Sequence, residues 1–317
     1  MELSIVIPVY NEEENVEPLI QEINAAVRPL GKGYEIIAVD DGSKDNTFPA
    51  LAQLYQNEPH LRVLKLKRNF GQTAALAAGL AYANGEVVVI MDGDGQNDPG
   101  DIPALLAELV RGNDLVSGWR YARQDALLSR RLPSMIANRL ISWATAVKLH
   151  DYGCTLKVMR KDVAKNLKLY GEMHRFIPAI AYERGARIAE LKVRHRPRLR
   201  GKSNYGIGRT LRVVLDLLTV KFLISYSTRP AHVFGPVGVA SVVVGFLIAA
   251  YLTIQKLVYQ AGIGGRPLLL LAILLIFIGF QFITMGLLGE MLARTYHETQ
   301  DRPIYAVGEI LEERKSA

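Results

Sequence analysis

The sequence predicts an α/β domain with a mostly parallel sheet, followed by an amphipathic interfacial region and two transmembrane helices. Apolar strand-like runs alternate with helix-like segments over the first 120 residues. Such continuous apolar strands are typical of a parallel sheet that helices cover on both faces. Two later runs, 233–254 and 267–289, contain no charged residue, and each reaches the roughly 20 residues that a helix needs to cross a bilayer.

The expected elements follow from hydrophobic periodicity. The apolar, β-branched runs predict strands at residues 3–9, 34–40, 61–67, 86–91, 115–117 and 187–194. Apolar residues at spacings of three and four predict helices at residues 15–27, 46–56, 72–83, 101–111 and 129–147. In a parallel α/β sheet the active site lies beyond the carboxyl ends of the strands, so functional residues are expected there.

Composition narrows the class of protein. The chain has 317 residues, 38 Lys and Arg against 31 Asp and Glu, and 50% hydrophobic residues. This length predicts about two domains, and the hydrophobic share excludes a disordered chain. The single cysteine, Cys154, excludes an intrachain disulfide and a cysteine-rich metal framework.

Charge around the apolar runs predicts the membrane topology. Residues 194–229 hold nine Lys or Arg and one acid, whereas the linker 255–266 holds only two cations. The positive-inside rule therefore places both ends of the hairpin in the cytoplasm, and the first residues lack the features of a signal peptide. A basic strip directly before a span can also hold anionic head groups or phosphates.

Four regions are expected along the chain. They are a cytoplasmic domain at residues 1–205, an amphipathic interfacial helix region at 206–231, a two-helix transmembrane hairpin at 232–290 and a cytoplasmic tail at 291–317. The polar residues of 206–226 fall on one stripe of a helix, which is typical of a helix lying in the membrane interface. A helix that packs between domains or subunits is the alternative.

Two acidic clusters follow predicted strands. Asp40 and Asp41 end the second strand, and Asp92, Asp94 and Gln96 follow the fourth. Side chains of a D-x-D sequence at a strand end project to the same side, since their period is two. Hard oxygen ligands of this kind suit Mg²⁺ or Mn²⁺ bound together with substrate phosphates. One such cluster alone could be a solvated turn, but two at one sheet edge favour a site.

The residue spacing excludes three other ligand-binding motifs. An EF-hand loop that starts at Asp92 requires Gly at position 97 and Glu at position 103, where the chain has Asn97 and Pro103. The first strand is not followed by the G-x-G-x-x-G sequence of a dinucleotide site, and no G-x-x-x-x-G-K-[ST] phosphate loop is present.

Six short motifs along the chain resemble those of a known enzyme family. Residues 4–12 (SIVIPVYNE), 39–43 (VDDGS) and 91–96 (MDGDGQ) resemble the family-2 glycosyltransferases of GT-A fold. Residues 116–120 (VSGWR), 151–154 (DYGC) and 198–205 (RLRGKSNY) look like those of the polyprenyl-phosphate glycosyltransferases, such as bactoprenol glucosyltransferases and dolichol-phosphate mannose synthases. The similarity covers essentially the whole chain.

The resemblance implies roles for matching positions. The expected nucleotide-binding residues are Pro8, Tyr10, Glu12, Asp40, Asp41 and Asp92, with Arg198 and Ser203 in a loop that closes over the donor diphosphate. Asp94, Gln96 and Asp92 are expected to hold the metal, Mg²⁺ or Mn²⁺. The acceptor phosphate is assigned to Arg120, Arg131, His174 and Arg175, and catalysis to Asp94, Asp151 and Arg120. For His174 and Arg175, a surface cap on the following helix is an equal alternative.

The reaction implied is inverting transfer of a single hexose from a nucleotide sugar to polyprenyl (undecaprenyl) phosphate, for modification of the cell envelope. A lipid monophosphate with a second pKa near ~6 is largely dianionic at pH 7 and needs no general base. Asp151 could therefore orient the arginines or the sugar, or act as a base. UDP-glucose is the preferred donor, with UDP-aminoarabinose, UDP-N-acetylhexosamine, UDP-galactose and GDP-mannose left open.

The remaining expectations concern partners and rival functions. The expected enzyme is a multi-pass protein of the inner (cytoplasmic) membrane and a homo-oligomer such as a tetramer, with no nucleic-acid partner. A processive polysaccharide synthase requires a Q/R-x-x-R-W motif, in which neither Trp119 nor Trp143 lies. A non-catalytic membrane scaffold is the rival from another class, and the retained acidic clusters argue against it.

Overall fold

The computed structural model describes residues 2–121, 147–167, 169, 173–196, 231–260, 262, 267–299 and 304–312. The chain forms two compact units, one of Met1–Val220 with Pro303–Ala317 and one of Lys221–Arg302. The predicted helix at 129–147, apart from its last residue, and the predicted interfacial helix at 206–226 lie outside the described residues.

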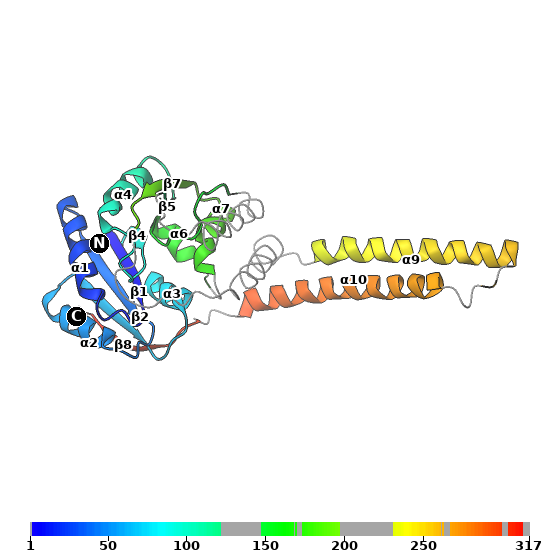
Figure 1. Ribbon diagram of the computed structural model, residues 1–317, viewed down its shortest axis with the longest axis horizontal. Coiled ribbons are helices and arrows are strands. Elements are labelled where there is room, and N and C mark those ends of the chain that lie inside the picture. The colour runs from blue at the N-terminus through cyan, green and yellow to red at the C-terminus, as the bar shows by residue number, and fades with distance from the viewer. Residues whose placement is uncertain are drawn as a thin grey trace. The chain divides into compact units, whose positions relative to one another are not determined.

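The first unit is built on one sheet of eight strands in the order β7-β5-β6-β4-β1-β2-β3-β8 (Figure 1). The strands are β1 Leu3–Val9, β2 Tyr34–Asp40, β3 Leu61–Leu66, β4 Val87–Ile90, β5 Leu115–Arg120, β6 Lys157–Arg160, β7 Ile188–Val193 and β8 Val307–Leu311. β1 pairs in parallel with β2 and β4, β2 with β3, and β5 with β7. β6 and β8 run antiparallel to their neighbours, so the sheet is mixed.

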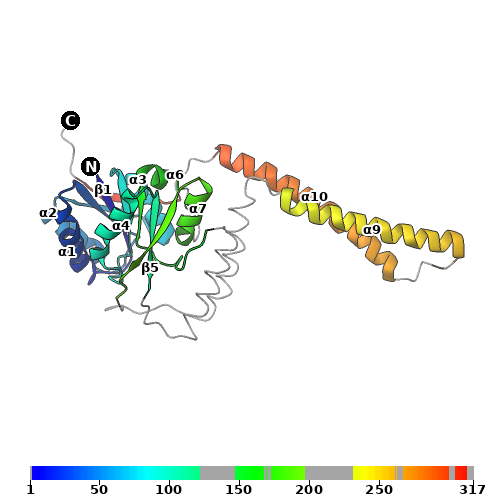
Figure 2. The same cartoon turned by 90° about the horizontal axis from the view of Figure 1, so that it is seen from above.

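Helices cover both faces of this sheet (Figure 2). The α-helices of the unit are α1 Val16–Val27, α2 Thr47–Asn57, α3 Gln72–Tyr82, α4 Ile102–Val110, α6 Lys161–Asn166 and α7 Ile177–Glu183, and short 3-10 helices lie at η1 Arg28–Leu30, η2 Pro99–Asp101 and η4 Met173–Phe176. Ile5 and Ile7 of β1 belong to one buried cluster with residues of α1, α2 and α4. Val6 points to the opposite face, where α3 packs close because a Cβ at Gly79 would lie 2.2 Å from Val6 Cγ1.

The predicted fold class is confirmed. Up to residue 111 every predicted strand and helix agrees with the structure within one residue at each end. These elements bury continuous apolar runs, and β1 and β2 are buried along their whole length. Strand β6 was not predicted because it is only four residues long and begins with a lysine, Lys157.

The C-terminal segment contributes to the sheet. Residues 291–317 were expected to form a tail, yet residues 307–311 pair with β3 as the edge strand β8. Beside it, the Arg62 guanidinium pairs with Glu312 Oε2 at 2.5 Å and with the buried Glu35 Oε2 at 2.6 Å. The chain therefore returns to the sheet of the first unit after the apolar hairpin.

The second unit consists of two long antiparallel helices, α9 Ala231–Tyr259 and α10 Pro267–Thr299. Phe234–Tyr259 and Pro267–Gly289 are long and apolar enough to cross a membrane, with mean hydropathies of 2.3 and 2.7. Within the apolar 18-residue segment of each stretch, only 17% and 11% of the residues are buried, which does not fit core helices of a soluble domain. Glycines allow the two helices to approach, because a Cβ at Gly238 would lie 2.7 Å from Gly279 O.

Candidate active site

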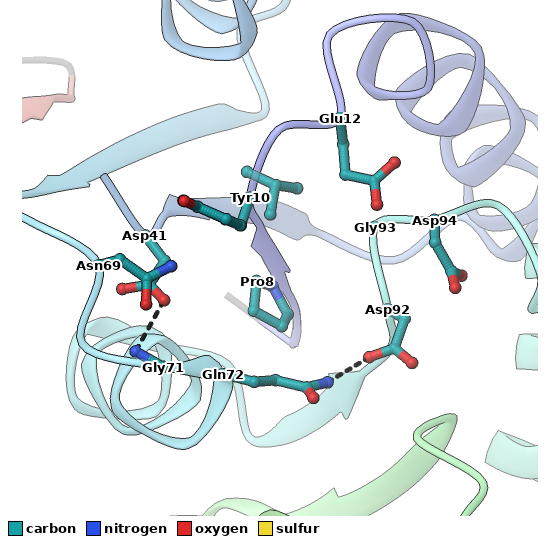
Figure 3. Close-up of a pocket in the computed structure, with 11 residues that line it drawn as sticks. Pro8, Tyr10, Glu12, Asp41, Asn69, Gly71, Gln72, Asp92, Gly93 and Asp94 are labelled. Atoms are coloured by element: carbon teal, nitrogen blue, oxygen red, sulfur yellow. Dashed lines mark hydrogen bonds between the residues drawn. The ribbon is translucent and has the colours of Figure 1, made fainter. Parts of the chain in front are cut away.

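A pocket of about 280 Å³ opens at the carboxyl end of the central strands. It is lined by Pro8, Val9, Tyr10, Glu12, Asp41, Asn69, Gly71, Gln72, Asp92, Gly93 and Asp94. Figure 3 shows Glu12, Asp92 and Asp94 along one rim, with Asp41 and Asn69 at the opposite rim. The segments that follow β1, β2, β3 and β4 thus meet at one sheet edge, as the parallel topology requires.

The end of β1 forms the floor of the pocket. A Cβ at Gly93 would lie 2.6 Å from Val9 Cγ1 and 3.0 Å from Pro8 O, so only glycine allows this approach. Gly93 separates the two carboxylates of Asp92 and Asp94, and its contact with β1 brings both to the pocket. The glycine in this D-x-D sequence therefore has a packing role.

Asp40 and Asp41, at the end of β2, lie in different environments. Asp41 lines the pocket, and its carboxylate accepts hydrogen bonds from the backbone N–H groups of Phe70 at 2.7 Å and Gly71 at 2.8 Å. Burial raises the pKa of Asp41, and the charge of Asp40 adds to this effect, while the two N–H donors oppose it. Asp41 thereby holds the loop that follows β3.

Asp40 is fully buried and is not among the residues that line the pocket. Its Oδ1 accepts a hydrogen bond from the Ser43 N–H at 3.0 Å. Its Oδ2 is buried and has no hydrogen-bond partner among the described residues. A buried, unpartnered carboxylate oxygen is costly. Because Asp40 does not line the pocket, its predicted contact with the nucleotide stays a prediction.

Asp92 and Asp94 form the acidic pair of the site. Desolvation raises the pKa of Asp92 to about 6, with a further increase from the nearby charge of Asp94, while a hydrogen bond from Thr155 and the charges of Lys157 and Arg120 oppose it. Two neighbouring carboxylates of this kind form a suitable site for a cation. Among the described residues there is no group of three His, Cys, Asp or Glu side chains placed to hold a metal ion.

The acidic pair therefore fits a hard divalent cation that takes its other ligands from water and from donor phosphates, as Mg²⁺ usually does. Gln96 is not among the residues that line the pocket. Its backbone N–H donates to Asp94 Oδ1 at 3.1 Å, and its carbonyl accepts from the Arg196 N–H at 2.9 Å. Gln96 thus supports Asp94 through its backbone, and its side-chain role as a metal ligand stays a prediction.

Arg120, at the end of β5, pairs with Asp151. Arg120 Nε donates to Asp151 Oδ2 at 2.7 Å and Nη2 donates to Oδ1 at 2.9 Å. The exposed fractions of the two side chains are 13% and 4%. Although burial opposes its charge, the bidentate pairing with Asp151 raises the pKa of Arg120, which is therefore a permanent cation.

His174 and Arg175 lie in η4, before α7. His174 is buried, and its Nδ1 lies 2.8 Å from Thr73 Oγ1 in α3. The preceding residue of α3, Gln72, donates from Nε2 to Asp92 Oδ1 at 2.6 Å (Figure 3). His174 is therefore connected to the acidic pair through two adjacent residues of α3. The predicted site residues Arg131, Arg198 and Ser203 lie outside the described residues.

Several site residues were not identified from sequence. Asn69, Gly71 and Gln72 follow β3, so the rule that active sites collect at strand ends could have found them. Lys157 lies in β6, is 1% exposed and donates to the Cys154 carbonyl, and burial lowers its pKa. No sequence signal marks it. Cys154 is buried, which raises the pKa of its thiol to about 11, so it is not a reactive thiolate at neutral pH.

Comparison with solved structures confirms the fold of the first unit. The chain matches glucosyl-3-phosphoglycerate synthase from Mycobacterium tuberculosis, solved with Mn²⁺ and UDP-glucose, with a TM-score of 0.54 and 20% identity over 69% of this chain and 78% of the other. Mannosyl-3-phosphoglycerate synthase from Rubrobacter xylanophilus matches with a TM-score of 0.57 and 17% identity over 70% and 74%. The first unit therefore has a GT-A-like fold.

Sequence comparison then identifies the family. Residues 4–168 match the family described as Glycosyl transferase family 2, and the chain belongs to this family. It is 46% identical to a dodecaprenyl-phosphate galacturonate synthase of Rhizobium johnstonii, over 100% of this chain and 95% of the relative. It is 38% identical to an undecaprenyl-phosphate 4-deoxy-4-formamido-L-arabinose transferase of Shewanella sediminis, over 98% and 92%. The predicted family resemblance is confirmed.

Proposed function

We propose that this enzyme transfers one sugar from a nucleoside diphosphate donor to a polyprenyl phosphate in the membrane. The observation that carries the proposal is the acidic pocket at the sheet edge, in a chain that matches polyprenyl-phosphate sugar transferases over 95% and 92% of their length. The apolar helices α9 and α10 supply the membrane attachment that a lipid acceptor requires.

The donor nucleotide binds in the pocket. Pro8, Tyr10 and Glu12 line one part of it, and Tyr10 is 39% exposed and available to contact a base. A divalent cation bound by Asp94 and Asp92 supplies positive charge against the donor diphosphate.

The acceptor phosphate is attracted by Arg120. Its planar guanidinium is suited to phosphate, because it can donate two hydrogen bonds at once. The dianionic acceptor is already nucleophilic at pH 7. The chain therefore has to position the phosphate in line with the sugar carbon, and direct attack inverts that carbon. Asp151 is engaged by Arg120 through both oxygens, which supports an orienting role over a role as base.

The identity of the donor sugar is inferred from the relatives. The two relatives are named for galacturonate and for 4-deoxy-4-formamido-L-arabinose, and neither is named for glucose. We therefore place UDP-galacturonate ahead of the UDP-glucose that the sequence motifs alone favoured. The higher identity, 46% against 38%, also places UDP-galacturonate ahead of UDP-4-deoxy-4-formamido-L-arabinose.

The connectivity supports a cytoplasmic orientation. The first unit contains chain from before and after the hairpin, Met1–Val220 and Pro303–Ala317, and α9 and α10 run antiparallel. Two spans of this kind leave both flanking segments on one side of the membrane. Because the basic strip at 194–229 adjoins this side, the positive-inside rule assigns it to the cytoplasm. The homo-oligomeric state stays a prediction.

A transfer assay tests the proposal. The purified full-length protein in detergent is incubated with undecaprenyl phosphate, Mn²⁺ or Mg²⁺, and separately UDP-galacturonate, UDP-4-deoxy-4-formamido-L-arabinose, UDP-glucose or GDP-mannose, and the lipids are analysed by mass spectrometry. We expect a glycosyl phospholipid from one UDP-sugar, lost in Asp94→Asn and kept in the control Asp162→Asn, whose side chain is exposed on α6. Product from a different donor would change only the sugar. Absence of product despite metal-dependent UDP binding would contradict the proposed acceptor.

A further inference from the structure

Glu190 lies in the middle of β7, opposite Ser117 in the register with β5. Its carboxylate accepts hydrogen bonds from two consecutive backbone N–H groups. His150 N lies 3.0 Å from both carboxylate oxygens, and Asp151 N lies 2.9 Å from Oε1. The His150 ring adds a third contact, since Nδ1 lies 2.7 Å from Oε2. The Glu190 side chain is 10% exposed, so solvent competes little for these bonds.

The segment held by Glu190 has no regular structure. Residues 147–156 belong to no helix or strand, so no backbone ladder fixes their position. The ring of Trp119 stacks on the ring of His150 at 4.1 Å with an interplanar angle of 15°. His150 is thus held by a carboxylate and by an aromatic ring, both from strands of the sheet.

The contacts of Glu190 with the backbone N–H groups of His150 and Asp151, here called the clamp, extend to the proposed acceptor site. Asp151, whose N–H is bound by Glu190, holds the Arg120 guanidinium through both carboxylate oxygens. Asp151 Oδ1 also accepts from the Gly153 N–H at 3.0 Å, which orients the carboxylate on its own backbone. Glu190 and Arg120 come from adjacent strands, and the connection between them runs through residues 150 and 151.

We infer that Glu190 is a positioning residue, which fixes Arg120 for the acceptor phosphate by clamping the backbone of His150 and Asp151. The inference rests on the proposed function of Arg120 as the phosphate-binding cation. Glu190 contacts neither donor nor acceptor in this scheme. Its loss should therefore weaken the acceptor site while the nucleotide pocket, built from the ends of β1 to β4, is unaffected.

The test measures two affinities on the full-length protein in detergent. The variant is Glu190→Ala, and the matched control is Glu309→Ala, an exposed glutamate in β8. We expect Glu190→Ala to raise the Kd of undecaprenyl phosphate about tenfold, a difference of about 1.4 kcal/mol, with the Kd of UDP and Mn²⁺ unchanged. Glu190→Gln keeps a carbonyl oxygen that can accept both N–H groups, so it should restore most of the lost affinity.

Hydrogen exchange of the peptide that contains residues 150 and 151 reports the clamp directly. We expect faster exchange there in Glu190→Ala and unchanged exchange in Glu309→Ala. An unchanged lipid affinity in Glu190→Ala, or an equal loss of lipid and UDP affinity, overturns the inference. Wild-type protein that binds UDP but not undecaprenyl phosphate overturns the proposed function instead. If wild type binds the lipid and Arg120→Ala binds it equally well, the role of Arg120 is overturned, and the inference with it.

Discussion

Arg120 and Asp151 form a bidentate ion pair that joins the end of β5 to a segment without regular structure, with N–O distances of 2.7 Å and 2.9 Å. The pair is almost fully buried. A carboxylate that is engaged by a guanidinium through both oxygens is a poor base, because the partner stabilises its ionised form. The pairing also fixes the plane of the guanidinium, on which bidentate binding of a phosphate depends.

Asp151→Asn should therefore reduce acceptor binding rather than abolish the chemical step. The amide keeps one oxygen but presents an NH₂ group to Arg120, so one charge-assisted hydrogen bond worth roughly 1.5–3 kcal/mol is lost. We expect the KM for undecaprenyl phosphate to rise by roughly 10- to 100-fold. Steady-state kinetics with each substrate varied in turn measures this. A collapse of kcat at saturating acceptor would instead assign Asp151 a direct chemical role.

Metal affinity should depend on pH because of Asp92. Its pKa is raised from 3.8 to about 6, so its carboxylate is half protonated near pH 6 and a cation must displace that proton. We expect the apparent Mn²⁺ affinity, measured by calorimetry in the presence of UDP, to fall by up to about tenfold per pH unit below pH 6. In Asp92→Asn the affinity should be lower at pH 7, and it should fall less between pH 7 and pH 5 than in the wild type, because only the UDP phosphate still takes up a proton there.

The raised pKa of Asp92 also affects the stability of the metal-free protein. A carboxyl whose pKa is higher in the folded protein than its unfolded value stabilises the fold at low pH, and this contribution is lost as the pH rises through the folded pKa. Between about pH 4 and pH 6, deprotonation of Asp92 should therefore lower the Tm of the metal-free protein. Mn²⁺ should restore the Tm above pH 6. A thermal shift series with EDTA or Mn²⁺ tests this, and a pH trend that persists in Asp92→Asn would rule out Asp92 as its source.

Arg62→Met should destabilise the first unit strongly. Burial opposes the ionisation of Glu35, but hydrogen bonds from Ser4, Asn84 and Arg62 lower its pKa below the usual value. Removal of Arg62 leaves a buried carboxylate that is 3% exposed, at a cost of roughly 3–5 kcal/mol. The control is Arg111→Met, since Arg111 is 76% exposed in its pair with Glu108 and should contribute about 0–1 kcal/mol. Equal losses in denaturant unfolding would contradict this difference.

Gly238→Leu should disrupt the helical hairpin. Any side chain there meets the Gly279 carbonyl oxygen and Ile283 Cγ1, both at 2.7 Å from the added Cβ. Overpacking of this kind costs roughly 1–3 kcal/mol. Gly235→Leu is a matched control in the same helix, because nothing lies within 4 Å of a Cβ at Gly235. Thermal stability in detergent should fall in Gly238→Leu alone, and an equal fall in both variants would show that the loss comes from glycine replacement itself.

Much of the fold could be predicted because its signals are local. The strands at 3–9 and 34–40 are continuous apolar runs, and both match the structure residue for residue. The acidic pairs at 40–41 and 92–94 follow two of these strands, and parallel topology brings strand ends together. Asp41, Asp92 and Asp94 line one pocket for this reason.

Other features depend on contacts between parts of the chain that are far apart in the sequence, and only the tertiary structure shows them. β8 is five residues long and has no strand signal of its own. Its partner β3 lies 241 to 248 positions earlier in the chain, from the pair Leu66 and Val307 to the pair Val63 and Leu311. The links from Gln72 to Asp92 and from Glu190 to Asp151 join residues 20 and 39 positions apart. Hydrophobic periodicity determines which segments become helices and strands, but only packing determines which polar side chains then lie within hydrogen-bonding distance.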